Sequence, residues 1–441
     1  MNIRMIVHIL GPDNVSLVGS RDRMCMNRLG RSIAGLMRRG AFGKSLISGL
    51  VFAVLASGPV SAQSRWISGW TFVPTATMGP AVPASRPNPN DVRGPLGPEI
   101  VADQTLTQTV RLTASGSALR VRLSNRYGST SVRLGAVSVS VAGGPLVPVT
   151  FDGQSEVSIP AGAPRLSDPV LLPIDALDDV TVNIFYPDET LLPTHRLRQT
   201  VRAGNATNQA MPAGPDLARF GVLLNGIEVK THRPTDVIVA FGDSITEGVT
   251  ATPGGPGGWP EQLGARLWGE SDRWSVVNAG IAGNRLLRRG SGPSGLERLD
   301  ADALAVAGAR CLIVLEGIND IGRPMQPAYA HETVTAEDII AGYRQIISRS
   351  HASNIKVVLA TIMPFEGAAY FSENGESIRQ RVNAWIRTAG EADGFIDFDR
   401  ATSDPDRPTL LLPVNDSGDR LHPSDAGYRV MAQSIPLTIC D

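Results

Sequence analysis

The chain has 441 residues, of which 42% are hydrophobic, and a mean hydropathy close to zero. This composition is typical of a globular protein that is long enough for two or three domains. Its 41 Lys and Arg residues nearly balance its 42 Asp and Glu residues, but 8 of the basic and only 2 of the acidic residues lie in the first 62 positions. The remainder is therefore net acidic, which argues against a nucleic-acid-binding protein.

The N-terminal segment has the features of a secretory signal peptide. A basic stretch precedes the apolar residues 45–56, and the small residues Val60-Ser61-Ala62 then offer a cleavage site. The apolar segment is too short to cross a bilayer. We therefore predict that residues 1–62 are a signal peptide with an extension before its true start codon. The mature protein should be secreted or periplasmic and should have no membrane span.

Residues 63–232 show the alternation of half-buried β-strands. Apolar residues skip one position in 119–123, 137–141 and 180–186, and glycines separate these runs. Strict period two with tight turns predicts an antiparallel β-sandwich. Its aromatic residues could stack on sugar rings, in which case this domain would bind carbohydrate; the alternative is that they belong to a structural core. These residues are Trp66, Trp70, Tyr127 and Tyr186.

Residues 233–441 alternate between apolar strands and amphipathic helices. The predicted strands are 237–241, 274–278, 311–315, 356–361 and 395–398, and the predicted helices are 259–268, 336–350, 378–389 and 425–434. Five strands with intervening helices predict a three-layer α/β/α sandwich around a parallel sheet. Such sheets place their ligands beyond the carboxyl ends of the strands.

The first of these strands ends in Gly242-Asp243-Ser244, which makes Ser244 the candidate nucleophile. A serine hydroxyl needs a base within hydrogen-bond reach and donors for the oxyanion that its attack creates. Near the C-terminus, Asp419 precedes His422 by three residues. This spacing lets the carboxylate orient the imidazole while the other ring nitrogen faces the serine.

Two further strand ends offer donors for an oxyanion. The glycine-rich loop 278–284 contains Gly283, whose backbone N–H can face an anion without a side chain in the way. The third strand is followed by Gly317-Ile318-Asn319-Asp320, and the side-chain amide of Asn319 can donate a hydrogen bond. Each feature alone could be an ordinary turn or cap, but the combination indicates a serine hydrolase.

In these residues the chain resembles the SGNH (GDSL) hydrolase superfamily over positions 236–437. Its four sequence blocks are matched in order by Ser244, Gly283, Asn319, and Asp419 with His422. The sequence around Gly283 and Asn319 is most similar to that of the branch of xylan-associated arylesterases and acylhydrolases. The longer members of this branch also have a preceding β-rich domain. The resemblance implies a flavodoxin-like fold with five parallel strands, in agreement with the strands predicted above.

The resemblance also implies a two-step acyl transfer. His422 takes the proton of Ser244, an acyl-enzyme forms, and the same imidazole activates the water that releases it. The oxyanion would be held by the backbone N–H groups of Ser244 and Gly283 and by the amide of Asn319. No cofactor is implied, and no metal-ligand cluster can be assembled from the histidines and cysteines.

The expected function is that of a secreted serine esterase acting on short acyl esters, acetyl esters above all, of carbohydrates or aryl alcohols. The substrate would be a small molecule or a polysaccharide ester. A transacylase would use the same residues and pass the acyl group to a sugar hydroxyl. A carbohydrate-binding protein without catalysis would be expected to have lost Ser244, Asn319 or His422, and the chain has all three.

Two cysteines remain after the signal peptide, Cys311 and Cys440. Cys311 opens the third predicted strand, and the final helix runs from the active-site end of the sheet toward the start of that strand. In an oxidising compartment the two thiols are permitted to pair. We therefore predict a Cys311–Cys440 disulfide, with buried free thiols as the alternative.

Overall fold

The computed structural model describes residues 64–75, 100–192, 196–210, 217–220, 223–270 and 272–441. These described residues belong to one compact unit. The predicted signal peptide, residues 1–62, lies outside the described residues. In the part of the chain that is described, every helix is too short or too polar to span a lipid bilayer.

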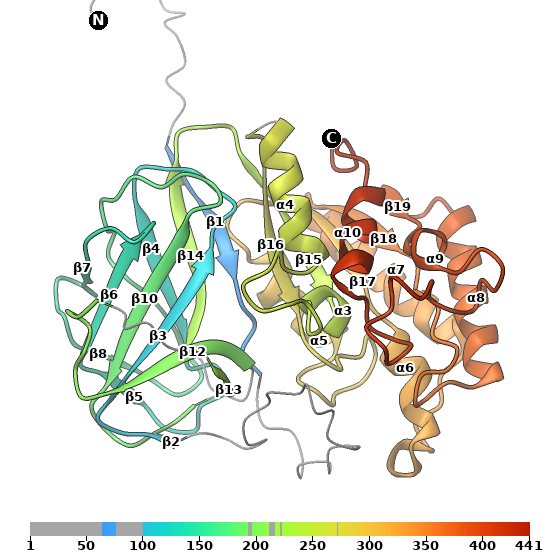
Figure 1. The fold of residues 1–441 in the computed structure, drawn as a ribbon, viewed down its shortest axis with the longest axis horizontal. Coiled ribbons are helices and arrows are strands. Elements are labelled where there is room, and N and C mark those ends of the chain that lie inside the picture. The colour runs from blue at the N-terminus through green and yellow to red at the C-terminus, as the bar shows by residue number, and fades with distance from the viewer. Residues whose placement is uncertain (1–63, 76–99, 193–195, 211–216, 221–222, 271) are drawn as a thin grey trace, which may run out of the picture. The chain divides into compact units, whose positions relative to one another are not determined.

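The first part of this unit consists of antiparallel strands (Figure 1). A four-stranded sheet has the order β1-β14-β4-β9, a six-stranded sheet has the order β13-β12-β3-β10-β6-β7, and two short pairs are β11-β2 and β5-β8. The strands are β1 (Arg65–Thr71), β2 (Ile100–Val101), β3 (Gln104–Arg111), β4 (Leu119–Ser124), β5 (Val132–Leu134), β6 (Ala136–Val141), β7 (Val147–Val149), β8 (Val157–Ile159), β9 (Pro164–Leu166), β10 (Asp179–Tyr186), β11 (Thr190–Leu191), β12 (Arg196–Ala203), β13 (Leu217–Phe220) and β14 (Leu224–Thr231).

Apolar and polar residues alternate along these strands because one face of each strand points into the β-sandwich. In β4 the side chains of Leu119, Val121 and Leu123 are fully buried, whereas the arginines between them are partly exposed. Burying one such aliphatic side chain stabilises a fold by about 1.5–3 kcal/mol, so the period-two pattern fixes which face of the strand points inward. The prediction of an antiparallel β-sandwich is confirmed.

The four aromatic residues considered for sugar binding lie in different environments. Tyr186 is fully buried, so its ring cannot stack on a sugar. The guanidinium of Arg120 lies 4.5 Å from the centre of the Trp66 ring, and Trp70 stacks on Phe72. Tyr127 is only partly buried, beside Arg126. These contacts favour a structural role for Trp66, Trp70 and Tyr186.

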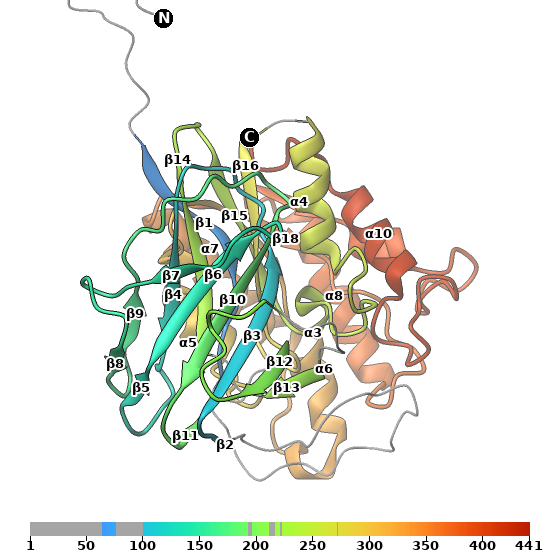
Figure 2. The ribbon, with the colours of Figure 1, turned by 60° about the vertical axis from the view of Figure 1, so that its left-hand side comes forward.

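The second part is an α/β/α sandwich around a five-stranded parallel sheet of order β16-β15-β17-β18-β19 (Figure 2). This is the flavodoxin-like order, and the predicted fold class is confirmed. Its strands are β15 (Asp236–Gly242), β16 (Trp274–Gly280), β17 (Ala309–Leu315), β18 (Lys356–Ala360) and β19 (Gly394–Ile396). The central strand β15 is apolar because both of its faces are covered, and Val237 to Phe241 are at most 1% exposed.

Helices cover both faces of this sheet. The helix α4 contacts β16 and α10, and α7 contacts β18, α5 and α8. The helical segments are α3 (Ser244–Glu247), α4 (Trp259–Glu270), α5 (Gly295–Leu299), the π-helix η1 (Asp300–Leu304), α6 (Ile318–Gly322), the 3-10 turns η2 (Arg323–Met325) and η3 (Pro327–Tyr329), α7 (Ala336–Ala352), α8 (Glu373–Thr388), α9 (Phe398–Thr402) and α10 (Asp425–Ser434).

Several helices begin directly after a residue whose side chain caps their first turn. The helix α7 begins with a capping box between Thr335 and Asp338, and the helix α10 begins after Ser424 and has the predicted bounds. The helix predicted at 378–389 starts earlier, because Ser372 caps it. The strand predicted at 395–398 is shorter, because Asp397 caps the new helix α9.

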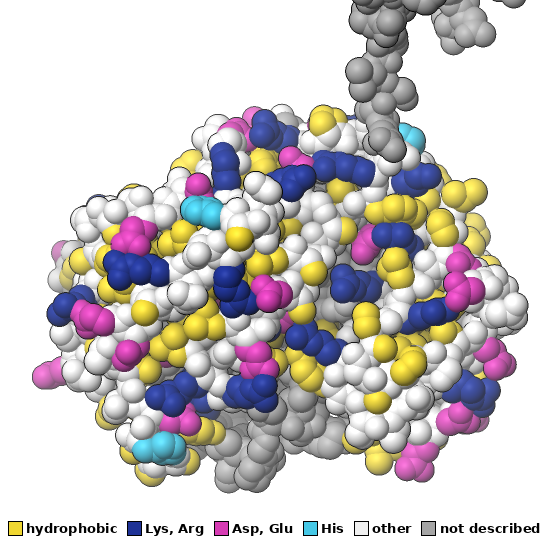
Figure 3. Space-filling model, turned by 180° about the vertical axis from the view of Figure 1, so that it is seen from behind, with side chains coloured by type: hydrophobic (Ala, Val, Ile, Leu, Met, Phe, Trp, Pro, Cys, Tyr) yellow, Lys and Arg dark blue, Asp and Glu magenta, His cyan; other side chains and the backbone are white. Residues whose placement is uncertain are grey.

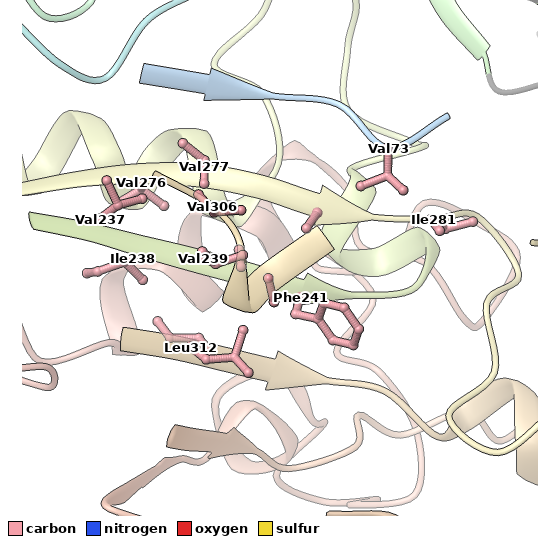
Figure 4. Close-up of a cluster of buried hydrophobic side chains, with 14 of the residues drawn as sticks. Val73, Val237, Ile238, Val239, Phe241, Val276, Val277, Ile281, Val306 and Leu312 are labelled. Atoms are coloured by element: carbon pink, nitrogen blue, oxygen red, sulfur yellow. The ribbon is translucent and has the colours of Figure 1, made fainter. Parts of the chain in front are cut away.

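The β-sandwich packs on β16, which is an edge strand of the parallel sheet. Thr113 Oγ1 donates to the carbonyl of Val276 at 2.7 Å, and Ser275 Oγ donates to the carbonyl of Ser68 at 2.9 Å. Figure 4 shows Val73, from the segment after β1, in one apolar cluster with side chains of β15, β16 and β17. The β-sandwich thus covers an edge strand that would otherwise expose unpaired backbone groups.

A disulfide joins Cys311 and Cys440, with 5.9 Å between the two Cα atoms. It attaches the C-terminus, beyond α10, to the amino-terminal part of β17 and closes a loop with a sequence separation of 129 residues. Both cysteines are buried. The carboxyl end of β17, where Asn319 follows, lies at the opposite end of the strand.

We expect the double variant Cys311→Ala, Cys440→Ala to lower the free energy of unfolding by about 2–5 kcal/mol, because the unfolded chain regains the entropy of the open loop. Urea unfolding of the oxidised wild type and of the variant measures this difference. The activity expected from the sequence should change little at room temperature, since the bond is remote from Ser244. Equal unfolding midpoints, or two free thiols in the unreduced wild type, would contradict the prediction.

Candidate active site

Ser244 lies at the first residue of α3, directly beyond the carboxyl end of β15. The turn depends on Gly242, because a Cβ there would come within 2.4 Å of the carbonyl oxygen of Leu315. Asp243 caps the helix: its Oδ1 accepts from the N–H of Ile245 at 2.9 Å. Burial raises the pKa of Asp243 to about 7. The side chain of Asp243 thus stabilises the turn. Ser244 itself is 6% exposed.

The structure brings the predicted base and its orienting carboxylate to Ser244. Ser244 Oγ and His422 Nε2 are 2.8 Å apart, and His422 Nδ1 lies 2.6 Å from Asp419 Oδ2. The other oxygen of Asp419 accepts from the backbone N–H groups of His422, at 2.8 Å, and Leu421, at 3.0 Å. A proton on Nδ1 leaves Nε2 free to accept the serine proton, which is the arrangement of a catalytic triad.

The charge of Asp419 is maintained by its surroundings. Partial burial raises the pKa of this carboxyl, but the hydrogen bond from His422, the charge of that ring and the two backbone N–H groups outweigh it and lower the pKa to about 2. Asp419 therefore stays ionised over the pH range in which an imidazole titrates. It can stabilise the imidazolium that forms when His422 takes the serine proton.

Gly283 lies in the loop after β16, three residues beyond Gly280. Its φ is +73°, a conformation that glycine adopts without strain. The loop is held on both sides of Gly283. Glu247 accepts from the backbone N–H of Ala282, and the two carboxylate oxygens of Asp320 accept from the N–H groups of Leu286, at 2.7 Å, and Leu287, at 3.0 Å.

Asn319 lies in the first turn of α6, which follows β17, and is 4% exposed. Its Nδ2 donates to the carbonyl oxygen of Asn284 at 3.0 Å, so the amide lies against the residue that follows Gly283. An amide nitrogen has two hydrogens, and the second remains for an oxyanion. All five predicted site residues thus lie at the carboxyl ends of three adjacent strands or in the loop before α10.

Tyr370 is a site residue that the sequence did not reveal. It is buried, its hydroxyl lies 3.3 Å from Asn319 Oδ1, and its ring packs on Gly322, where a Cβ would come within 2.2 Å of it. By donating to Oδ1, the hydroxyl fixes the orientation of the amide, so that Nδ2 is the atom that faces the loop of Gly283. Tyr370 is a positioning residue, and no pattern around it in the sequence indicates this.

Arg298 was also missed by sequence reasoning. It is fully buried, donates to the carbonyls of Gly242 (2.9 Å) and Ala279 (2.7 Å) and to Asn284 Oδ1 (2.8 Å), and pairs with Glu316 at 3.2 Å. Its guanidinium therefore connects the ends of β15, β16 and β17. Burial raises the pKa of Glu316 well above its ordinary range, and Arg298 opposes this rise.

A serine paired with a histidine and an aspartate at the carboxyl edge of a parallel sheet defines a serine hydrolase on an α/β/α scaffold. Residues 240–430 match the model of the GDSL-like lipase/acylhydrolase family, and the chain therefore contains a hydrolase domain of this family. The match includes Ser244, Gly283, Asn319, Asp419 and His422. No curated protein matched the chain.

Solved structures also resemble the chain. An aryl esterase from M. smegmatis is 18% identical, with a TM-score of 0.36, and the alignment covers 45% of this chain and 96% of that one. A catalytic mutant of an acetylxylan esterase from Geobacillus stearothermophilus is 22% identical, with a TM-score of 0.36, covering 46% and 94%. A GDSL-like lipase from Bacteroides thetaiotaomicron is 21% identical, with a TM-score of 0.34, covering 46% and 87%.

Proposed function

We propose that this hydrolase is a secreted or periplasmic serine esterase that removes short acyl groups, acetyl above all, from carbohydrates or aryl alcohols. The observation that carries the proposal is the continuous chain of hydrogen bonds from Ser244 Oγ through His422 to Asp419, with distances of 2.8 and 2.6 Å. The Cys311–Cys440 disulfide supports an oxidising compartment, because such bonds are rare in reducing ones.

In the proposed reaction Ser244 Oγ attacks the ester carbonyl while His422 Nε2 takes its proton. The carbonyl oxygen gains negative charge and is stabilised by the N–H groups of Ser244 and Gly283 and by Asn319 Nδ2. His422 then gives its proton to the leaving alcohol, and an acyl-enzyme remains on Ser244. A water molecule, deprotonated by the same imidazole, releases the acid and restores the serine.

The preference for short acyl groups follows from the residues around Ser244. At the proposed site the side chains of Asn319, His422 and Tyr370 are polar, and each of them is held by a hydrogen bond. An apolar tunnel would stabilise a bound chain by about 0.8 kcal/mol for each buried methylene. Only 5% of the residues in the whole sequence are aromatic, so few aromatic side chains are present that could line such a tunnel.

We expect kcat/KM on para-nitrophenyl esters to fall as the acyl chain grows from acetate to laurate. Initial rates of the mature protein on the series measure this trend, and release of acetate from acetylated xylan tests the carbohydrate substrate. The Ser244→Ala variant provides the background rate. A higher kcat/KM for laurate than for acetate would overturn the short-acyl proposal. Acylated sugar appearing in place of free acetate, when a sugar acceptor is added, would identify a transacylase.

A further inference from the structure

Arg323 lies beside the proposed oxyanion site. Its backbone N–H donates to the carbonyl of Asn319, so it follows Asn319 by one helical turn and shares its side of α6. A Cβ built on Gly283 would lie 2.9 Å from Arg323 Nη2 and 2.7 Å from Ser291 Oγ. The guanidinium therefore packs against the backbone of the glycine that is proposed to hold the oxyanion.

The charge of Arg323 has no carboxylate partner among the described residues. Its polar contact there is Ser291 Oγ at 3.5 Å, and its guanidinium lies 5.6 Å from the centre of the Tyr329 ring. Two neighbouring arginines, in contrast, do have carboxylate partners. Arg285 pairs with Glu332, and Arg298 pairs with Glu316. The side chain of Arg323 is only partly buried, so it remains accessible to a ligand.

We propose that Arg323 forms an anion-binding subsite, and that the preferred substrates are esters carrying a carboxylate close to the scissile bond. Acylated uronic acids and acylated hydroxybenzoates have this chemistry. The planar guanidinium can donate two parallel hydrogen bonds to a carboxylate, which fixes both distance and orientation. This inference rests on the proposed esterase function and adds the charge of its substrate.

Recognition of such a substrate would depend on the local positive charge of Arg323 and would not require a broad basic patch on the surface. On the face drawn in Figure 3, basic and acidic side chains are interspersed. The described region of the active site also contains the buried carboxyls of Asp243, Glu316 and Asp320. A carboxylate-bearing ester would therefore be recognised at one short-range contact, Arg323, and the contact should weaken as ionic strength rises.

The test compares anionic and neutral esters of matched shape. One pair, meta-acetoxybenzoate and methyl meta-acetoxybenzoate, carries the charge on the alcohol side. The other pair, para-nitrophenyl hemisuccinate and para-nitrophenyl butyrate, carries it on the acyl side. For the wild type and for Arg323→Gln, the measured quantity is the anionic-to-neutral ratio of kcat/KM. We expect the ratio of at least one pair to fall on the order of ten- to a hundredfold, as for a lost hydrogen bond to a charged group.

Two further variants make the result specific. Arg323→Lys keeps the charge and should retain part of the preference, whereas Arg288→Gln removes an exposed charge from the same loop region and should leave the ratio as in the wild type. Ratios that differ by less than about twofold between wild type and Arg323→Gln, for both pairs, would overturn the inference. Ser244-dependent hydrolysis of the neutral esters in that case would leave the proposed esterase function intact, and its absence in the wild type would refute both.

Discussion

Replacing Ser244 by alanine should lower kcat by about 10⁴- to 10⁶-fold, with the fold unchanged. The reason is that the variant loses the atom that forms the acyl-enzyme, while the oxyanion donors and the binding groups remain. His422→Ala should lower kcat by about as much, because it removes the base that lies 2.8 Å from the serine hydroxyl. Asp419→Ala should lower kcat less, since it removes only the group that orients and stabilises the imidazole.

The measurement is the rate of para-nitrophenyl acetate hydrolysis at substrate saturation, with circular dichroism as the check on folding. Ser353→Ala is a suitable control, because Ser353 is an exposed serine at the end of α7 whose hydroxyl donates to the carbonyl of Arg349 at 3.3 Å and has no part in the proposed site. It should retain wild-type activity. Near-normal turnover by a folded Ser244→Ala variant would exclude Ser244 as the nucleophile.

Asn319→Ala should lower kcat on the order of 100- to 1000-fold with little change in KM. The amide is proposed to donate to the oxygen that becomes charged in the transition state, so its removal affects that state more than the bound ester. A rise in KM with unchanged kcat would instead show that Asn319 contributes to substrate binding alone.

Tyr370→Phe provides the matched variant for this prediction. It keeps the ring that packs on Gly322 and removes only the hydroxyl 3.3 Å from Asn319 Oδ1. If the hydroxyl acts by orienting the amide, Tyr370→Phe should lower kcat less than Asn319→Ala does, and the double variant should be little worse than Asn319→Ala alone. Fully additive effects of the two changes would contradict this coupling.

The sequence by itself determined the two architectures and the residues that carry the chemistry. Period-two apolar residues in 119–123 require a strand with one buried face, and the continuous apolar run before Gly242 requires a strand buried on both faces. The carboxyl ends of parallel strands meet at one edge of a sheet. Polar residues that directly follow such strands, Ser244 and Asn319, could therefore be assigned to one site before their distances were known.

Only the tertiary structure decided which side chains hold these groups in place. Arg298 reaches Gly242 across 56 residues, and Tyr370 reaches Asn319 across 51. Arg323 meets Gly283 although they follow different strands of the sheet. Periodicity reports whether a position is buried, but it carries no information about the partner of a buried polar group. That partner is set by the order of the strands and by the course of the loops, and so by the packing of the whole chain.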